Sequence, residues 1–108
     1  MEIKYSKIHK YDIGYTNKQE LDILKDEIFN QEIYKIDLNA DTPVIFDLGS
    51  HIGLSILYFK MNYPNAKVVG FEPNPNIFPL LEENVYCNNL NNVELHNIAL
   101  GNTEEVRD

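Results

Sequence analysis

Residues 44–53 read VIFDLGSHIG, and this stretch decides the fold. The run Val44–Leu48 is apolar and rich in residues that favour strands, so it predicts a buried parallel strand. The segment from Gly49 to Gly53 predicts a turn, because glycine permits backbone angles that other residues avoid. Apolar residues at helical spacing over 54–61 predict a helix after the turn. The stretch therefore predicts a strand, a glycine turn and a helix in immediate succession.

The same order repeats farther along the chain. Residues 67–72 read KVVGFE and predict a second strand, and residues 93–96 alternate in polarity and predict a third. Between them we expect a helix that begins at Ile77 with Asn76 as its N-cap, because Pro79 then falls in the first turn. Strand, helix, strand, helix, strand with two crossover connections is one half of a doubly wound α/β sheet.

A different pattern precedes this half-domain. Apolar and polar residues alternate over residues 1–16 and predict short strands that could form a hairpin. Asn17 and Glu20 have the spacing of a capping box, and a helical pattern follows over residues 18–30. We therefore expect two segments, a lead-in over 1–43 and an α/β half-domain over 44–108.

Composition excludes several classes of protein. The chain has 108 residues, 9 basic and 17 acidic, which gives a formal net charge of −8. This acidity argues against a nucleic-acid partner, because few cations are present to neutralise phosphates. The single cysteine excludes a disulfide framework or a multi-cysteine zinc site. Neither a membrane span nor a secretory signal is visible, so a cytoplasmic location is the default expectation.

The turn after the first α/β strand has the chemistry of a ligand site. Ligands of open α/β sheets bind beyond the carboxyl ends of the strands. Gly49 lets a ligand lie against the backbone, and the helix that follows offers free N–H groups to a carboxylate. Glu72 ends the second strand 23 residues after Gly49, a spacing at which an acid can accept hydrogen bonds from ribose hydroxyls. A solvated acid at the strand end is the alternative for Glu72.

His51 narrows the choice among nucleoside ligands. A dinucleotide fold needs glycine at this position so that the pyrophosphate can touch the backbone, and an imidazole would obstruct it. S-adenosylmethionine has no phosphate, and its sulfonium cation suits the negative field of Asp47 and Glu72. The chain has no Gly-Lys-Ser or Gly-Lys-Thr, so a phosphate-binding P-loop is excluded. His51 could instead cap the following helix.

Four segments together carry a family resemblance. They are residues 44–53, residues 70–75 (GFEPNP), the pattern Leu-x-x-Asn-x-x-x-Asn over 81–88, and residues 97–101 (NIALG). In this combination the chain resembles the FkbM-type S-adenosylmethionine-dependent methyltransferases over about residues 20–104. The resemblance implies an α/β, Rossmann-like class I methyltransferase fold. Only its first half is expected, with three parallel core strands and crossover helices, together with the N-terminal helix and short strands.

The resemblance implies roles for residues at the first turn. Ser55 would lie near the carboxylate of the cofactor. Independently of the resemblance, Asp47 is expected to stabilise the turn by fixing backbone groups of Gly49, so that its contact with the cofactor is indirect. The family usually has asparagine where this chain has His51. The methionine end of S-adenosylmethionine would be lined by Gly49, Ser50, His51 and Gly53.

The resemblance also implies roles at the next two turns. Glu72 would hold the ribose hydroxyls and Pro73 would border the adenine. Ala99 and Leu100 would meet the adenine edge. Many class I enzymes have an aspartate near the position of Ala99, which this chain lacks. Asn84 and Asn88 are expected to make structural hydrogen bonds rather than to bind ligand.

The expected function is methyl transfer from S-adenosylmethionine, with O-methylation of a small molecule or sugar implied by the resemblance. The strands that usually supply acceptor contacts and any general base are missing, so no catalytic residue and no metal ligand are assigned. Two alternatives remain, a non-catalytic module that binds S-adenosylmethionine or another nucleoside, and an RNA methyltransferase. Because the sheet is incomplete, the edge of the strand Val44–Leu48 is expected to be apolar and exposed, and to favour a homodimer or other edge pairing.

Overall fold

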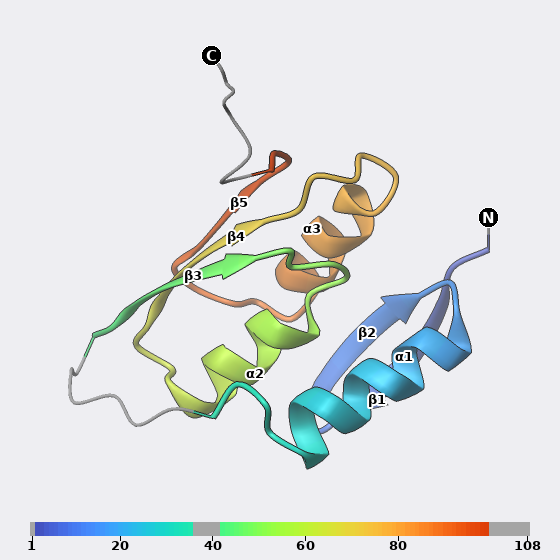
Figure 1. Ribbon diagram of the computed structural model, residues 1–108, viewed down its shortest axis with the longest axis horizontal. Helices are drawn as coiled ribbons and strands as arrows, with labels where there is room; N and C mark the ends of the chain where they lie inside the picture. The colour runs from blue at the N-terminus through green and yellow to red at the C-terminus, as the bar shows by residue number, and fades with distance from the viewer. Residues whose placement is uncertain (1, 36–41, 100–108) are drawn as a thin grey trace.

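The structure, a computed structural model, describes residues 2–35 and 42–99 and contains two separate sheets (Figure 1). Strands β1 (Lys4–Ile8) and β2 (Tyr11–Tyr15) form an antiparallel two-stranded sheet. The expected N-terminal hairpin is therefore confirmed. Ile8, Tyr11 and Ile13 are buried, which shows that the alternation in the sequence marks the face that packs on the rest of the chain.

The helix expected over 18–30 is present, in two parts. Helix α1 (Lys18–Lys25) has Asn17 as its N-cap, whose side chain accepts a hydrogen bond from the Glu20 backbone N–H at 3.0 Å. A π-helical turn, Asp26–Asn30, continues it. The expected cap is thus confirmed, since a side-chain oxygen satisfies one of the free N–H groups of the first helical turn.

The second sheet has the topology expected of the α/β half-domain. Strand β3 (Val44–Leu48), helix α2 (Leu54–Asn62), strand β4 (Lys67–Phe71), helix α3 (Phe78–Cys87) and strand β5 (Val93–His96) follow one another along the chain. The strands are parallel and lie in the order β3-β4-β5. This arrangement is a partial Rossmann-like fold. The proposed division of the chain at residue 43 stays a prediction.

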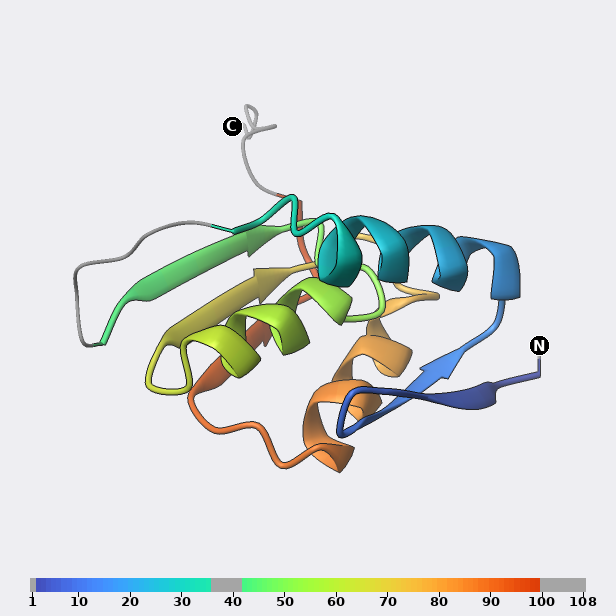
Figure 2. The same ribbon diagram turned by 90° about the horizontal axis from the view of Figure 1, so that it is seen from below.

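Helices α2 and α3 lie on the same side of this sheet (Figures 1 and 2). On that side Val68 of β4 and Leu57 of α2 are almost completely buried. Gly70 permits the close approach, because a Cβ there would come within 2.7 Å of Ser50 Oγ and 2.9 Å of Ile56 Cδ1. In the part of the chain that the structure describes, no helix is long and apolar enough to cross a membrane.

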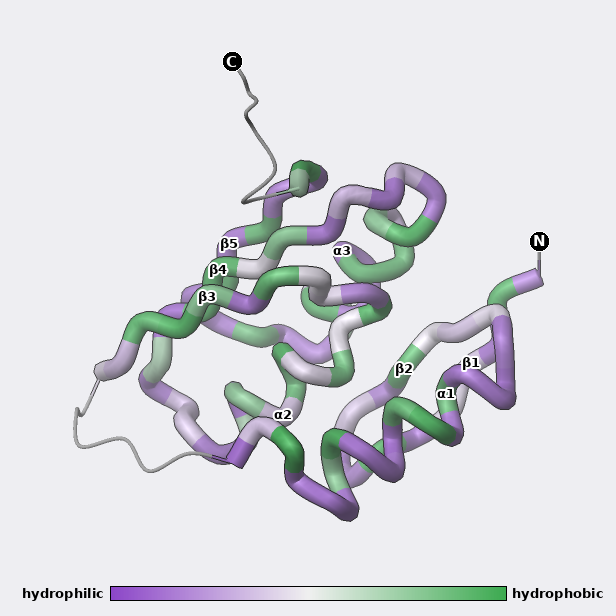
Figure 3. Tube along the Cα trace, in the orientation of Figure 1, coloured by the Kyte–Doolittle hydropathy of each residue, from purple (hydrophilic) through white to green (hydrophobic). Residues whose placement is uncertain are grey.

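The opposite face of β3 is bare. Val44, Phe46 and Leu48 are 61%, 67% and 64% exposed, and Figure 3 shows that β3 is one of the more hydrophobic segments of the trace. The sequence-based expectation of a strand buried on both faces is therefore wrong for this face. Among the described strands, β3 pairs with β4 alone, so the expected exposed apolar edge is confirmed.

Helix α3 begins differently from the expectation. Its N-cap is Ile77, not Asn76, and no side chain caps it. Asn76 instead donates its backbone N–H to Asn74 Oδ1 at 2.9 Å, because these residues form a local turn before the helix. Asn89, shortly after the helix, has a left-handed backbone with φ of 54°, a conformation that asparagine tolerates at a helix end.

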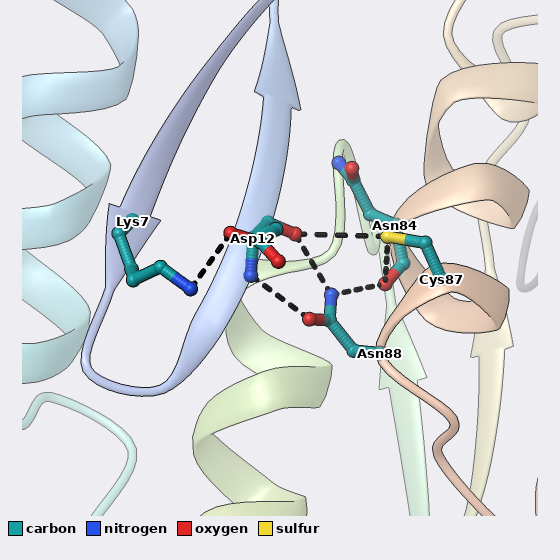
Figure 4. Close-up of polar contacts among 5 residues, drawn as sticks. All are labelled: Lys7, Asp12, Asn84, Cys87 and Asn88. Carbon is teal, nitrogen blue, oxygen red and sulfur yellow. Dashed lines mark hydrogen bonds and ion pairs between the residues drawn. The ribbon is translucent and has the colours of Figure 1, made fainter.

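Two asparagines, Asn84 in α3 and Asn88 at its C-cap, attach the N-terminal hairpin to the half-domain. Asn84 accepts from Gly14 N at 2.7 Å and donates to Gly14 O and Ile52 O at 3.0 and 2.8 Å. One turn later, Asn88 accepts from Asp12 N and donates to Asp12 O (Figure 4). The structural role expected for both asparagines is confirmed, and their partners are backbone groups distant in sequence.

Candidate functional site

The expected ligand site lies where β3, β4 and β5 end. The turn Gly49–Gly53 follows β3 and the turn Glu72–Asn76 follows β4, while Asn97 to Ala99 follow β5. Parallel strands end at the same edge of a sheet, so these three turns lie together. Leu100, which the resemblance places at the adenine edge, lies outside the described residues.

Glu72 joins the turns. The residue is only 6% exposed, and its carboxylate accepts hydrogen bonds from His51 N at 2.7 Å and Asn74 N at 3.0 Å. The side-chain amide of Asn97 donates to the Glu72 backbone carbonyl at 2.7 Å, which attaches the third turn. The alternative of a solvated acid is therefore wrong. Two oxygens offer about four acceptor positions, so both could still accept hydroxyl groups of a ligand.

Gly49 leaves open space at the start of the turn. Its φ is 78°, and a Cβ built on it would meet nothing within 4 Å. The backbone N–H groups of Gly49 and Ser50 donate to Phe71 O at 2.8 and 2.9 Å, so the turn is anchored on the end of β4. A side chain at this position would be strained and would occupy the open space.

Asp47 stabilises the turn through two serines rather than through Gly49. Its Oδ2 accepts from Ser50 Oγ at 2.9 Å and from Ser55 Oγ at 2.5 Å. The expectation that Asp47 fixes backbone groups of Gly49 is wrong, because the carbonyl of Phe71 takes those N–H groups. Burial raises the pKa of the Asp47 carboxyl, the serine hydroxyls lower it, and the charge of Glu72 raises it.

His51 occupies the middle of the turn in a strained conformation. Its φ is 54°, a left-handed value that costs free energy in any residue but glycine. The hydrogen bond from its N–H to Glu72 holds it there. Its Nε2 lies 3.2 Å from Glu20 Oε1, while Nδ1 is buried and has no partner among the described residues. His51 therefore faces α1 and does not act as the N-cap of α2, which is Gly53.

The remaining expected site residues differ in exposure. Ser55 is buried in the first turn of α2, with its hydroxyl bound to Asp47. Pro73 and Ala99 are exposed on the turns after β4 and β5. A small cavity of about 40 Å³ under the glycine turn is lined in part by Gly49, Ser50, His51 and Ser55. This volume suits a few small atoms of a ligand and not a nucleoside.

Three residues at this edge were not expected from the sequence. Glu20 contacts His51 across from α1, Asn74 donates to Glu72, and Asn97 binds the carbonyl of Glu72. The sequence around Glu20 indicates its position at the helix cap. Nothing in that sequence indicates its other contact, with His51. Asn74 and Asn97 follow the ends of strands, a position that is typical of ligand sites. Asparagine is frequent in this chain, so the residue type did not distinguish them.

The arrangement can bind a ligand with hydroxyl groups, while most of its titratable side chains already hold hydrogen-bond or ion-pair partners. Glu72 offers a buried carboxylate beside an open glycine turn. Asp47 is bound to two hydroxyls, and the His51 Nε2 faces Glu20. No group of three or more potential metal ligands occurs among residues 2–35 and 42–99.

Comparisons with curated proteins identify methyltransferases. The chain is 33% identical to Methyltransferase 1 of Beauveria bassiana over 84 residues, which cover 78% of this chain and 34% of that protein. It is 39% identical to Methyltransferase sdnD of Sordaria araneosa over 67% of this chain and 28% of that protein. It is 32% identical to the 31-O-demethyl-FK506 methyltransferase FkbM of Streptomyces tacrolimicus, again over 67% and 28%. No protein-family model matches the sequence.

Solved structures of similar fold are also transferases. A putative transferase from Pyrococcus horikoshii superposes with a TM-score of 0.65 at 16% identity, over 90% of this chain and 36% of that one. TYW2 of M. jannaschii, solved in complex with AdoMet, superposes with a TM-score of 0.62 at 20% identity, over 95% and 45%. These likenesses confirm the expected α/β, Rossmann-like class I methyltransferase fold.

The curated relatives are much longer than the part that matches. The chain spans between 28% and 34% of the length of these three proteins. The matched part amounts to two thirds or more of this chain, and the fold agrees with it. The resemblance of this chain to the FkbM-type S-adenosylmethionine-dependent methyltransferases is therefore confirmed, over about one third of such a protein.

Proposed function

We propose that this chain binds S-adenosylmethionine at the carboxyl ends of β3, β4 and β5, as the cofactor-binding part of an enzyme that methylates a hydroxyl group of a small molecule or sugar. The observation that carries the proposal is the Glu72 carboxylate. It is buried, points toward the glycine turn through its bond to His51 N, and retains acceptor capacity.

The residues present fit this cofactor. Glu72 would accept hydrogen bonds from the two ribose hydroxyls, while Pro73 and Ala99 would border the adenine. The open space at Gly49 would admit the amino-acid end against the backbone. The buried Nδ1 of His51 has no hydrogen-bond partner among residues 2–35 and 42–99, and an unsatisfied buried polar atom costs about 1–3 kcal/mol. A polar group of a ligand could remove this cost.

The cofactor would supply a methyl group already activated by a sulfonium, so the protein's contribution is mainly to orient the two reactants. The residues described here would perform the first part of that task. Glu72 and the glycine turn hold one reactant in a fixed position, and Asp47 with Ser50 and Ser55 keeps the turn rigid.

A binding module without catalysis is the second candidate. The hydrogen bonds that already engage the carboxylates of Asp47 and Glu72 favour it. Binding of S-adenosylhomocysteine without transfer of a radiolabelled methyl group to any hydroxylated acceptor would support this candidate.

RNA is a less favoured acceptor than a small molecule, because the chain carries a net charge of −8. A filter-binding assay with tRNA checks this. We expect no affinity that depends on salt concentration, and a salt-sensitive complex would revive the RNA alternative.

Thermal unfolding with S-adenosylhomocysteine beside NAD tests the cofactor. A ligand present at 100 times its dissociation constant stabilises the folded state by about 2.7 kcal/mol. In a chain of this size we expect the midpoint to rise by about 10 °C or more. A rise with NAD and none with S-adenosylhomocysteine would overturn the proposal.

A further inference from the structure

A pocket of about 260 Å³ lies away from the candidate site. Four segments meet there: the turn between β1 and β2, the end of α2, the loop before β4, and the segment between α3 and β5. The pocket is therefore at the amino ends of β4 and β5, whereas the candidate site is at the carboxyl ends. Its lining includes Lys10, Tyr11, Lys60, Pro64, Asn89 and Leu90.

Hydrogen bonds hold these four segments together. Asn88 bonds both backbone groups of Asp12, at 2.9 and 2.8 Å, which fixes the hairpin beside the end of α3 (Figure 2). Lys60 Nζ donates to Pro64 O at 3.0 Å and to Ala66 O at 2.7 Å, which fixes the loop before β4 on the end of α2. The pocket is therefore preformed, as small-molecule sites usually are.

Lys60 brings a buried cation to the pocket. The residue is 6% exposed, and none of the ion pairs within residues 2–35 and 42–99 includes it. A buried charge without a counter-ion is unfavourable, and burial lowers the pKa of the Lys60 ammonium. An anion in the pocket would stabilise the charged form. The two carbonyl oxygens use two of the three N–H groups of the ammonium, so one remains for an anion.

Lys10 adds a second cation. Its side chain is exposed and its Nζ lies 5.6 Å from the centroid of the Tyr11 ring. Among the described residues, the lining contains neither aspartate nor glutamate, although the whole chain has a net charge of −8. The carboxylate of Asp12, the next residue of β2, pairs with Lys7 at 3.0 Å. The pocket therefore concentrates positive charge on an acidic chain.

The ends of α2 and α3 oppose this charge only in part. The C-terminus of a helix carries about half a negative elementary charge, whereas each of the two lysines carries a full positive one. Carbonyl groups at both helix ends also have partners. Phe59 O accepts from Tyr63 N at 2.7 Å, and Asn84 O accepts from Asn88 Nδ2 at 2.7 Å. The positive charge therefore prevails.

The lining also offers contacts to an organic group. Tyr11 is buried and Leu90 is half-buried, while the side-chain amides of Asn89 and Asn91 are on exposed residues. A phosphate monoester has three acceptor oxygens and a charge of about −1.5 to −2 at pH 7. These oxygens match ammonium and amide donors, and the apolar residues match a small organic body.

We propose that this pocket binds the phosphate monoester of a small molecule. Lys10 and Lys60 would hold the phosphate, and Tyr11 and Leu90 would pack on the organic part. The inference goes beyond the proposed function and does not depend on it, because the glycine turn and Glu72 are not part of this lining.

Backbone-amide NMR on the full chain, in a buffer without phosphate, tests the proposal with phenyl phosphate, inorganic phosphate and phenol. We expect phenyl phosphate to shift the signals of Tyr11, Leu90 and Asn91 and to leave Gly49 unchanged. Phenol lacks the charge and inorganic phosphate lacks the ring. Each should bind at least about fivefold more weakly, since one charge at close range is worth about 1 kcal/mol in water. Equal binding of either probe would overturn the proposal.

Lysine variants test the two cations. Lys60→Met keeps the unbranched stem and should abolish binding, and Lys10→Met should weaken it about fivefold, or about 1 kcal/mol. Lys25→Met, at an exposed lysine of α1, is the matched control and should bind like the wild type. Circular dichroism checks folding, and Lys10→Met, at an exposed position, keeps the test decisive if Lys60→Met unfolds. Absent shifts in the wild type, or unchanged affinity in Lys10→Met, would overturn the proposal.

A second titration with S-adenosylhomocysteine present separates this inference from the proposed function. We expect phenyl phosphate to bind with the same affinity, because the two sites lie at opposite ends of the strands. If S-adenosylhomocysteine displaces phenyl phosphate, the phosphate pocket is wrong and the cofactor site stands. If S-adenosylhomocysteine fails to bind while phenyl phosphate shifts Tyr11 and Leu90, the proposed function is wrong and the phosphate pocket stands.

Discussion

One face of the β3–β4–β5 sheet is covered by helices, whereas on the other face β3 carries exposed apolar side chains. On the covered face, Asp47 is buried and bound to Ser50 and Ser55. On the bare face, Phe46, one residue earlier in β3, is 67% exposed. Alternation along a strand sends neighbouring residues to opposite faces.

The difference shows which face of the sheet the described helices cover and which face they leave exposed. The covered face positions the glycine turn and Glu72 of the candidate site. The bare face exposes a row of apolar residues of the kind that usually marks a contact with another segment or molecule. The expectation of a homodimer or edge pairing through β3 stays a prediction.

The largest expected difference is in the free energy of unfolding, when one side chain is truncated on the covered face and one on the bare face. Leu57→Ala removes a side chain that is 1% exposed on the covered side and should lower the free energy of unfolding by about 3 kcal/mol. Phe46→Ala should change it by less than about 0.5 kcal/mol, as is usual for surface residues. Urea unfolding measures both. Equal losses would show that the bare face is covered in solution.

Removal of the asparagines of α3 tests how the hairpin is held on the covered side. Asn84→Ala leaves three buried backbone groups without their partner and should cost about 2–3 kcal/mol of unfolding free energy. Asn88→Ala, whose bonds to Asp12 are more exposed, should cost about 1 kcal/mol. Chemical denaturation compares the two. A smaller loss for Asn84→Ala would contradict its role as the main attachment.

Charge on the bare face tests self-association. Phe46→Lys should weaken any dimer by about tenfold, or 1.4 kcal/mol, because a cation would be buried at the contact. Tyr86→Lys, an equally exposed aromatic position on α3, is the matched control. Sedimentation velocity over a concentration series measures the effect. A wild-type chain that stays monomeric throughout would refute the expected dimer.

The pH dependence of stability has the smallest expected effect. Because burial raises the pKa of Asp47 above its ordinary value of 3.8, the folded state holds this proton at a pH where the unfolded state has lost it. The free energy of unfolding should therefore fall as pH rises from about that value through the raised pKa, and then level off. Subtracting the pH profile of Asp47→Asn isolates this contribution. A difference that grows with pH would reverse the sign and contradict the burial of the carboxyl.

The elements of this fold were predictable where their signals are local. The capping pair Asn17 and Glu20, the alternation in β2 and the run Val44–Leu48 each lie within a few residues, so their structures follow from short-range rules. The N-cap of α3 was misplaced because Asn74 and Asn76 offer competing turn geometries of similar local propensity.

The candidate site was predictable only in outline. The position of Glu72 at a strand end indicates its place beside the turn, but its bonds to His51 and Asn74 depend on three-dimensional packing. The contact between Glu20 and His51 joins elements 31 residues apart. The sequence predicted the exposed edge of β3 but not its bare face. An apolar run has the same pattern whether one or both faces of the strand are covered.

Calorimetric titration of S-adenosylhomocysteine into the wild type, Glu72→Ala and the exposed control Glu94→Ala addresses the central claim most directly. We predict that Glu72→Ala weakens binding by about 1–3 kcal/mol, or roughly 5- to 150-fold, through loss of a charged hydrogen-bond acceptor. Glu94→Ala should bind like the wild type, and circular dichroism checks that both variants remain folded. An unchanged affinity in folded Glu72→Ala would contradict the assignment of this carboxylate to the ribose.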